Sequence, residues 1–328
     1  MNKLLLLLLL SIFFFKCKLD NKQSSVSFDQ DPNENSSTYV LPDTTKIPEG
    51  PEGDMIRYGL ALVRNTAYYI GPDGVAGNFL GNKMNCTNCH LDAGTRPHGF
   101  NFYSTYGNYP QYRSREDAVL TMEQRVNNCV ERPHNGKPLP LDSKEMVAIV
   151  TYIKFLGTGM KIGEKAKISE AIEITFPNRA ADPMKGKEIF MRECISCHME
   201  DGLGKWWPDS SGYEYPPLWG SKGYQPGSSM FRIIKAARFI KANMPFDKAS
   251  WENPVLTDEE AFDVAAYINS SEHIRPVSNG RDYKDPGTKY VDYPFGPYND
   301  PFPEDQHKFG PFQPIIDYRK DKGLYLKY

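Results

Sequence analysis

Two Cys-x-x-Cys-His motifs hold the residues of this chain that are best suited to chemistry. The motifs are Cys86-Thr-Asn-Cys89-His90 and Cys194-Ile-Ser-Cys197-His198. In such a motif the two thiols add to the vinyl groups of haem, and the adjacent histidine reaches the iron as its proximal ligand. One copy alone could be a redox dithiol or half of a zinc site. Two copies in one chain with an export signal instead predict two covalently bound haem c groups, with His90 and His198 as proximal ligands.

A further thiol, Cys129, has no such assignment. The chain has six cysteines, of which four belong to the motifs and Cys17 follows an apolar N-terminal run. An unpaired cysteine in an exported protein requires an explanation. Cys129 could be a distal haem ligand, a small buried apolar residue, or a thiol that pairs between molecules.

An internal repeat favours the first of these interpretations. The two motifs begin 108 residues apart, Tyr152 and Tyr267 are 115 residues apart, and Cys129 and Met244 are also 115 residues apart. Each sulfur residue therefore precedes its tyrosine by 23 residues. The repeat predicts Cys129 as the distal ligand of the first haem and Met244 as that of the second. Because a thiolate lowers and a thioether raises the potential of haem iron, we expect electrons to pass from the first haem to the second.

Other side chains could compete for the irons. Met160 is the alternative for the first haem, and Met230 and Lys241 are the alternatives for the second. The remaining histidines have no counterpart in the other half of the chain, so we expect them to be surface or packing residues; they are His98, His134, His273 and His307.

The pattern of apolar residues predicts a mostly α fold that would position these ligands. Helical spacing is expected at residues 54–70, 114–130, 143–156, 183–192, 229–242 and 257–268. In the second of these helices, the expected buried stripe consists of Val119, Leu120, Met122 and Val126. The last helix begins with a capping box formed by Thr257 and Glu260. Residues 91–112 and 206–224, rich in Gly, Pro and aromatic residues, are expected to be irregular.

The N-terminus predicts export. Lys3 precedes an apolar run that is too short for a comfortable membrane span and fits a secretory signal. Cys17 follows, where a lipoprotein is lipidated, although Lys16 is unusual there and simple cleavage or an uncleaved anchor are alternatives. The expected location is periplasmic. With a net charge of −2, the chain shows no sign of a basic nucleic-acid surface, and no nucleic-acid partner is expected. Membrane contact is expected only through the lipid anchor.

These features predict five segments. Residues 1–17 are the signal with the lipidated cysteine, and 18–53 form a polar tether. Residues 54–176 form the domain of the first haem, and 177–274 that of the second. Residues 275–328 are an irregular tail rich in Pro and aromatic residues, expected to wrap the surface and seal the contact between the two domains.

Several segments resemble the thiosulfate dehydrogenases, dihaem cytochromes c that couple two thiosulfates into tetrathionate. The resemblance extends from about residue 55 to 316 and includes segments outside the haem motifs, so it is specific to this family. The segments that carry it are Met84–Gly94, Tyr109–Arg115, Glu123–Arg132, Asn135–Leu139, Ile240–Pro245, Phe295–Tyr298 and Gln306–Phe312.

The resemblance implies an active-site haem ligated by His90 and Cys129. It also implies that arginines near the thiol bind the sulfur anions, and Arg115 and Arg125, with Arg113 as a third candidate, occupy those positions. Thiosulfate is a dianion, and joining two of them calls for cationic, bidentate donors. For any one arginine, and for Arg132 above all, the alternative is a solvated helix face. Electrons would leave through the second haem to a small periplasmic electron carrier.

Two departures from the family pattern leave alternatives open. Pro133 stands where relatives commonly have a serine, and Asn243 where some have a lysine that competes for the second iron. The preferred direction therefore stays open, and a tetrathionate reductase is one alternative. The others are a cytochrome that conjugates thiosulfate to a sulfur-carrier protein, a plain electron-transfer cytochrome c, and a dihaem peroxidase.

Overall fold

The computed structural model describes residues 42–278 and 282–328. The predicted signal, Cys17 and most of the predicted tether lie outside the described residues. Within them, no helix combines the length and the apolar character needed to cross a membrane.

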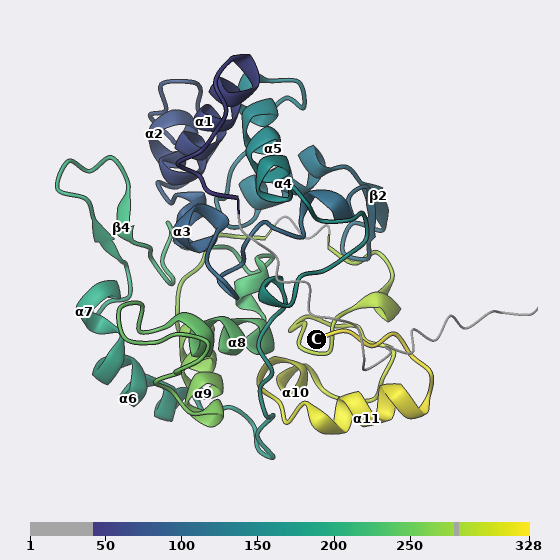
Figure 1. The fold of residues 1–328 in the computed structure, drawn as a ribbon. Helices are drawn as coiled ribbons and strands as arrows, with labels where there is room; N and C mark the ends of the chain where they lie inside the picture. The colour runs from purple at the N-terminus through teal and green to yellow at the C-terminus, as the bar shows by residue number, and fades with distance from the viewer. Residues whose placement is uncertain (1–41, 279–281) are drawn as a thin grey trace, which may run out of the picture. The chain divides into compact units, whose positions relative to one another are not determined.

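The described residues are mostly helical, with two short antiparallel hairpins (Figure 1). The α-helices are α1 (Pro51–Arg64), α2 (Thr66–Ile70), α3 (Leu91–Gly94), α4 (Met122–Glu131), α5 (Lys144–Leu156), α6 (Pro183–Glu193), α7 (Ile195–His198), α8 (Ile233–Asn243), α9 (Asp258–Ile268), α10 (Glu304–Phe309) and α11 (Gln313–Asp321). Strands β1 (Gln111–Arg113) and β2 (Ala118–Leu120) form one hairpin, and β3 (Lys205–Trp206) and β4 (Tyr213–Tyr215) form the other. Short 3-10 turns cover Cys86–Asn88, Tyr106–Asn108, Lys167–Ser169, Ser229–Phe231 and Pro286–Thr288.

The internal repeat is a repeated helix crossing. In the first half α1 packs on α5, and in the second half α6 packs on α9. Each crossing depends on a glycine, since a Cβ at Gly59 would overlap the carbonyl oxygen of Ala148, and one at Gly186 would overlap that of Asp263. The next neighbours of these two positions are the Cβ atoms of the repeat tyrosines, Tyr152 and Tyr267. The tyrosine repeat in the sequence thus marks equivalent packing positions.

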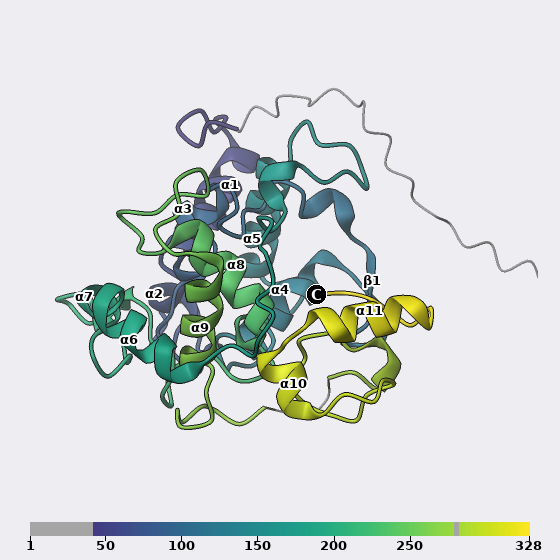
Figure 2. The same cartoon turned by 90° about the horizontal axis from the view of Figure 1, so that it is seen from below.

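Each half has its own apolar core. The first core is built by α1, α4 and α5, and Leu62, Met146, Tyr152 and Leu156 are fully buried in it. The second core is built by α6, α8 and α9, which lie together in Figure 2. Apolar residues of the tail complete this second core; they are Val291, Phe312, Ile315 and Ile316.

The predicted helix at 114–130 is wrong over its first half. Residues 111–120 form the β1–β2 hairpin, and Val119 is 64% exposed instead of buried. The helix begins only at Met122, after Thr121, whose side chain forms a capping box with Gln124. This Thr-x-x-Gln signature marks the true start of the helix. The consequence is a short α4 that carries Arg125 and Cys129.

Most of the other helix predictions are confirmed to within a few residues. Ser143 caps α5, and Thr257 forms the expected capping box with Glu260 at the start of α9. The first predicted helix is split at Asn65 into α1 and α2. The helix predicted at 229–242 begins with a 3-10 turn and becomes α-helical at Ile233.

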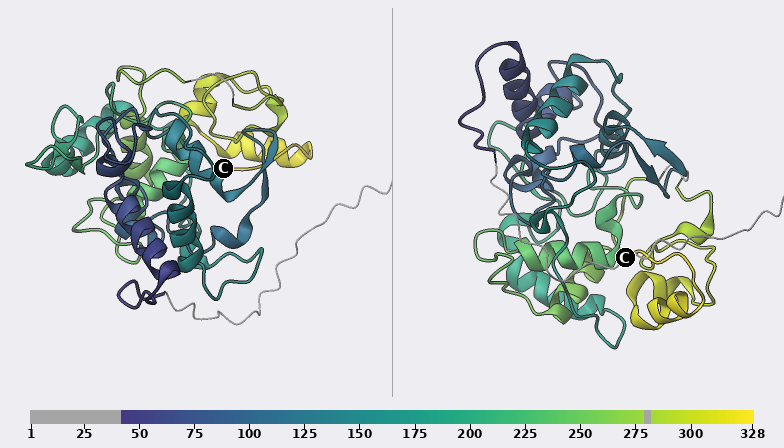
Figure 3. Two further views of the ribbon diagram at one scale, coloured as in Figure 1. Left: turned by 90° about the horizontal axis from the view of Figure 1, so that it is seen from above. Right: turned by 45° about the vertical axis from the view of Figure 1, so that its right-hand side comes forward.

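The tail is less irregular than expected, because it contains α10 and α11 on one side of the described chain (Figure 3). It contacts both halves. The hydroxyl of Tyr325 donates to Ser114 Oγ in the first half at 3.2 Å. The backbone N–H of Ala181 in the second half donates to the carbonyl of Phe309 in α10 at 2.7 Å.

Replacing either crossing glycine by alanine should destabilise the protein. We expect Gly59→Ala and Gly186→Ala each to lower the free energy of unfolding by about 1–3 kcal/mol, since a methyl group must be forced into a filled contact. Denaturant titration followed by circular dichroism measures this. Gly107→Ala is the matched control, because its Cβ would make only an ordinary contact, 3.4 Å from the Lys161 carbonyl oxygen. An equal loss in all three variants would contradict the role of the crossings.

Candidate functional site

The first motif is held by side chains around it. The backbone N–H of Cys86 donates to Thr66 Oγ1 at 2.9 Å, and that of Ala67 donates to Asn85 Oδ1 at 2.9 Å. Asn85 and Asn88 also form a capping box around the 3-10 turn. These bonds fix the motif to the junction of α1 and α2.

Both motif histidines are oriented by a backbone carbonyl. His90 Nδ1 lies 2.5 Å from the carbonyl oxygen of Phe100, and His198 Nδ1 lies 2.9 Å from that of Pro216. A hydrogen bond at Nδ1 fixes the ring and leaves Nε2 to a metal. The two motifs therefore present their histidines in the same way.

The motif thiols suit thioether bonds. All five cysteines within the described residues are free thiols. Burial raises the pKa of Cys86 to about 11 and the pKa values of Cys89 and Cys194 to about 12. Such thiols are disfavoured as thiolates, whereas an uncharged thioether is compatible with an apolar site.

The second motif faces an apolar cavity of about 270 Å³. Cys194, Cys197 and His198 line it on one side, and Met244 at the end of α8 also faces it. Its remaining walls include Leu218, Phe239, Ile240, Val264 and Ile268. Two thiols, a histidine and a thioether around an apolar cavity are the donor set that haem c requires, so the residues fit this group.

The structure argues against one of the two alternative ligands of the second iron, Lys241, but not against the other, Met230. Lys241 forms an ion pair with Asp258, which takes its ammonium group away from the cavity. Met230 lines the same cavity as Met244. Cys89, Thr87 and other residues of the first motif line it too, which places the two sites next to each other.

Cys129 lies at the first motif, next to a cation. Arg125, one turn earlier on α4, donates from Nη1 to Cys129 Sγ at 3.3 Å. Burial raises the pKa of this thiol, but the charge of Arg125, a hydrogen bond with His90, and the charge of Arg132 outweigh burial and lower the pKa to about 6. Cys129 in turn is the main reason why the pKa of Arg125 is raised. The two predicted ligands of the first haem thus meet in one charged site.

Arg115 is close to this site, but its guanidinium group bonds to the second half and to the tail. Its Nη1 donates to the carbonyl of Gly227 in the second half at 2.9 Å, and its Nε lies 3.6 Å from Asp282 Oδ2 in the tail. Burial lowers the pKa of Arg115, but Tyr283 and Asp282 outweigh burial and raise it. Arg115 and Arg125 are near enough for each charge to act on the other.

Arg132 is not on a solvated helix face, so that alternative is wrong. It is 5% exposed, and its Nη2 lies 2.6 Å from Asp282 Oδ1 and 3.1 Å from Glu116 Oε1. Arg113, the third candidate for anion binding, donates instead to Gln111 Oε1 within the hairpin at 3.0 Å. Of the predicted arginines, the structure brings Arg125 to the thiol and Arg115 next to it.

The other histidines behave as packing residues. His273 stacks on Trp219 with ring centroids 3.8 Å apart, and buried His307 bonds to Val291 and Asp300. His98 Nδ1 bonds to the carbonyl of Glu170. His134 is buried near His90, and burial lowers its pKa to about 4.

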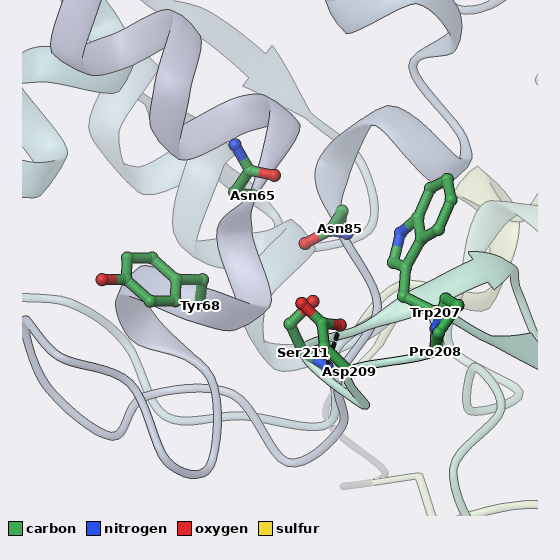
Figure 4. Close-up of a pocket in the computed structure, with 7 residues that line it drawn as sticks. All are labelled: Asn65, Tyr68, Asn85, Trp207, Pro208, Asp209 and Ser211. Carbon is green, nitrogen blue, oxygen red and sulfur yellow. Dashed lines mark hydrogen bonds between the residues drawn. The ribbon is translucent and has the colours of Figure 1, made fainter.

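A second cavity, of about 400 Å³, has no cysteine in its lining (Figure 4). It is lined by Asn65, Tyr68, Asn85, Trp207, Pro208, Asp209 and Ser211. None of these residues is a predicted ligand or anion-binding residue. We assign no chemistry to it.

Known proteins resemble this chain over most of its length. Residues 80–162 match the SoxA/TsdA cytochrome c domain, and residues 183–272 match the cytochrome c family. The chain is 34% identical to the thiosulfate dehydrogenase of Stutzerimonas stutzeri over 79% of its own length and 80% of that protein. It is 32% identical to the thiosulfate dehydrogenase of Allochromatium vinosum over 73% and 84%. The chain belongs to the thiosulfate dehydrogenase family.

A solved relative agrees in fold. The thiosulfate dehydrogenase TsdBA from Marichromatium purpuratum is 32% identical and superposes with a TM-score of 0.64 over 72% of this chain. The chain spans half of the length of that solved chain. The predicted fold of two cytochrome c domains is confirmed, and it implies two covalent haem c groups.

The ion pairs of Asp282 should be needed for stability. We expect Asp282→Asn to lower the free energy of unfolding by about 3–5 kcal/mol, because it leaves the buried Arg132 charge without its main partner. Denaturant titration measures the loss. The control is Asp54→Asn, which breaks an exposed pair with Arg57 and should cost less than about 1 kcal/mol. Equal stability of the Asp282 variant and wild type would show that this pair is not important.

Proposed function

We propose that this protein is a thiosulfate dehydrogenase that couples two thiosulfates into tetrathionate at Cys129. The observation that carries the proposal is the hydrogen bond from Arg125 to the Cys129 thiol, next to His90. A cytochrome c that only transfers electrons does not need a cysteine thiolate with a guanidinium group hydrogen-bonded to it. The curated relatives that the chain matches over most of their length carry the same activity in their names.

We assign His90 and Cys129 as iron ligands of the first haem, and His198 and Met244 as those of the second. Cys86 and Cys89 would hold the first group, and Cys194 and Cys197 the second. For Met244, support comes from the cavity that it shares with His198 and from the engagement of Lys241 by Asp258. The bound haem groups supply one-electron acceptors for the electrons that leave the sulfur atoms.

Charge is the main obstacle to this reaction, and the site addresses it. Two thiosulfate dianions must approach each other and an anionic thiolate. Arg125 lies at the thiol, and Arg115 is near enough to act on Arg125 electrostatically. A buried guanidinium stabilises such charge more strongly than an exposed one, because water does not screen it.

The chemical steps balance as follows. The Cys129 thiolate and the terminal sulfur of one thiosulfate form an S–S bond and release two electrons, which gives Cys129–S–S–SO₃⁻. A second thiosulfate attacks the sulfane sulfur of this adduct. Tetrathionate leaves, and the Cys129 thiolate is regenerated with no further electron change. Run backwards, the same steps reduce tetrathionate, so both directions share one set of residues.

The two electrons leave the protein for a small electron carrier in the periplasm. We place the protein there, with a lipid on Cys17 as its membrane attachment. The support is the apolar N-terminal run followed by this cysteine.

One alternative has a specific observation in its favour. The chain is also similar to the SoxA subunit of the L-cysteine S-thiosulfotransferase of Chlorobaculum thiosulfatiphilum, at 31% identity over 29% of this chain and 32% of that protein. A conjugating enzyme of that kind would form no free tetrathionate from thiosulfate alone. Product analysis with thiosulfate and an artificial acceptor separates the two functions, and we expect free tetrathionate.

Replacing Cys129 tests the proposed chemistry. We expect Cys129→Gly to retain both covalent haem groups, because the motif thiols are untouched, and to lose turnover in both directions. Haem content is measured by the pyridine haemochrome assay and turnover by steady-state kinetics. Intact-mass spectrometry should show a thiosulfate adduct on wild type and none on the variant. Full activity of the variant would contradict the mechanism.

Arg125 should contribute to the rate through the charge of its guanidinium group and through the fixed, planar arrangement of its N–H donors. We expect Arg125→Met to lower kcat/KM for thiosulfate by about 10²–10³-fold. Arg125→Lys should recover only part of this, because an ammonium group keeps the charge but not this arrangement of donors. Arg113→Met serves as the control, since Arg113 bonds within the hairpin. Similar losses for Arg113→Met and Arg125→Met would contradict the assignment.

A further inference from the structure

Lys235 is a partly buried cation without an anion. It lies in the first turn of α8, and its Nζ sits 4.6 Å from the centre of the Phe100 ring. Within residues 42–278 and 282–328, its ammonium group makes no hydrogen bond or ion pair. The other lysine on this helix, Lys241, does have a partner, Asp258. A cation–π contact alone replaces only part of the hydration that a buried ammonium group loses.

The surroundings of Lys235 are strongly positive. Arg232, Lys235 and Arg238 follow one another at intervals of three residues, so they share one side of α8. The first turn of α8 contains no acidic residue, although the positive end of the helix dipole lies there. Asp292, whose charge acts on Lys235, already accepts hydrogen bonds from Arg232 Nη1 at 2.9 Å and from the N–H of Ile234 at 3.0 Å. This group of charges is therefore short of an anion.

Two contacts connect Lys235 to the thiol site. The ring under its ammonium group belongs to Phe100, whose carbonyl accepts the hydrogen bond from His90 Nδ1. The charge of Arg125, the residue that donates to Cys129, also acts on Lys235 and lowers its pKa. Lys235 thus belongs to the second half of the chain but faces the site of the first half.

The electrostatics agree with a missing partner. Burial, with the charges of Arg232, Arg238 and Arg125, lowers the pKa of Lys235 to about 7, and Asp292 opposes this only in part. A dianion placed between Lys235 and Arg125 would restore the charged ammonium form. It would also separate two like charges that now repel each other.

We propose that Lys235 is a substrate-binding residue, which extends from the second domain and holds the sulfonate end of thiosulfate or tetrathionate while Arg125 acts at the thiol. This inference rests on the proposed function. It makes the anion site a joint product of both domains, in which α4 supplies the thiol and one cation and α8 supplies another. Tetrathionate has a sulfonate at each end, so a second cation away from the thiol suits its length and charge.

The test compares Lys235→Met, Lys235→Arg and Lys144→Met in the full-length holoprotein. Methionine keeps an apolar chain of similar length against the Phe100 ring and removes only the charge. Arginine keeps the charge. Lys144→Met is the matched control, because Lys144 also sits over a ring, 5.0 Å from the centre of Tyr58, but is itself exposed at the start of α5. KM and kcat are measured in both directions, and thiosulfate binding to the oxidised protein by isothermal titration calorimetry.

For Lys235→Met we expect KM and the dissociation constant of thiosulfate to rise by about 10- to 100-fold, the loss typical of a hydrogen bond to a charged group. The change in kcat should be smaller, and haem content and absorption spectrum should stay as in wild type. Lys235→Arg should bind nearly as wild type does, and Lys144→Met should be unchanged.

Other outcomes overturn the inference. Unchanged KM and dissociation constant in Lys235→Met would show that the ammonium group does not bind substrate. Altered haem content or spectrum with unchanged binding would instead place Lys235 at a haem carboxylate. If wild type binds thiosulfate but does not turn it over, the proposed function fails, and the binding comparison still decides the role of Lys235. If wild type binds no thiosulfate, both fail.

Discussion

Buried positive charge is the constraint around which this site is built. Arg125 and Arg132 act on the Cys129 thiol, and Arg115 and Lys235 lie within electrostatic reach of Arg125. Each of these cations must be stabilised where water is largely excluded. Removing one charge of a buried pair is costly, because its partner is left without compensation. The chain responds with acidic partners brought from far away in sequence. Asp282 serves two of the arginines, and Asp292 serves Arg232 on α8. Among the described residues, Arg125, which donates to the thiol, and Lys235, on which the charge of Arg125 acts, have no carboxylate partner.

This division gives the site its selectivity. An arginine with a carboxylate partner has little left to offer a substrate, whereas a cation without one attracts an anion of suitable size. Within the described part of the chain, Arg125 donates to Cys129 and to no carboxylate. Under the proposed function, a sulfur dianion at this place would meet a nucleophile and a counter-charge together. The helix crossings at Gly59 and Gly186 give the two halves the same helix packing. Cys89 of the first motif also lines the cavity at the second motif.

The candidate ligands could be proposed from the sequence because they obey local or repeating rules. Each motif is contiguous, and the 115-residue repeat that pairs Cys129 with Met244 reflects the equivalent places of Tyr152 and Tyr267 at the helix crossings. The hairpin at 111–120 was missed because short strands beside a helix can imitate helical spacing, as Val119 did. The capping box at Thr121 was the available signal.

Asp282 could not be found in this way, because it lies 150 residues from Arg132 and no local pattern connects them. The burial of Arg132 has a similar cause, because Asp282 of the tail, Glu116 of the hairpin and Gly227 of the second half all lie against its side chain. Lys235 was missed for another reason. On an amphipathic helix a lysine between apolar residues indicates a solvated face, and only the approach of Phe100 from the other half makes that face an interior one. Glu116, which also contacts Arg132, sits in the turn of the unforeseen hairpin.

The tail has a consequence for the order in which the protein matures. Val291, Phe312 and Ile315 complete the second core, while Asp282 holds arginines of the first half. A chain emerging from the ribosome can form the α1–α5 crossing early, since all of its residues are already made. The group of charges around Cys129 cannot be completed until the tail with Asp282 has been made. Until then the arginines lack their carboxylate partners, so a chain shortened at its C-terminus would carry both Cys-x-x-Cys-His motifs and still have no assembled site for sulfur anions.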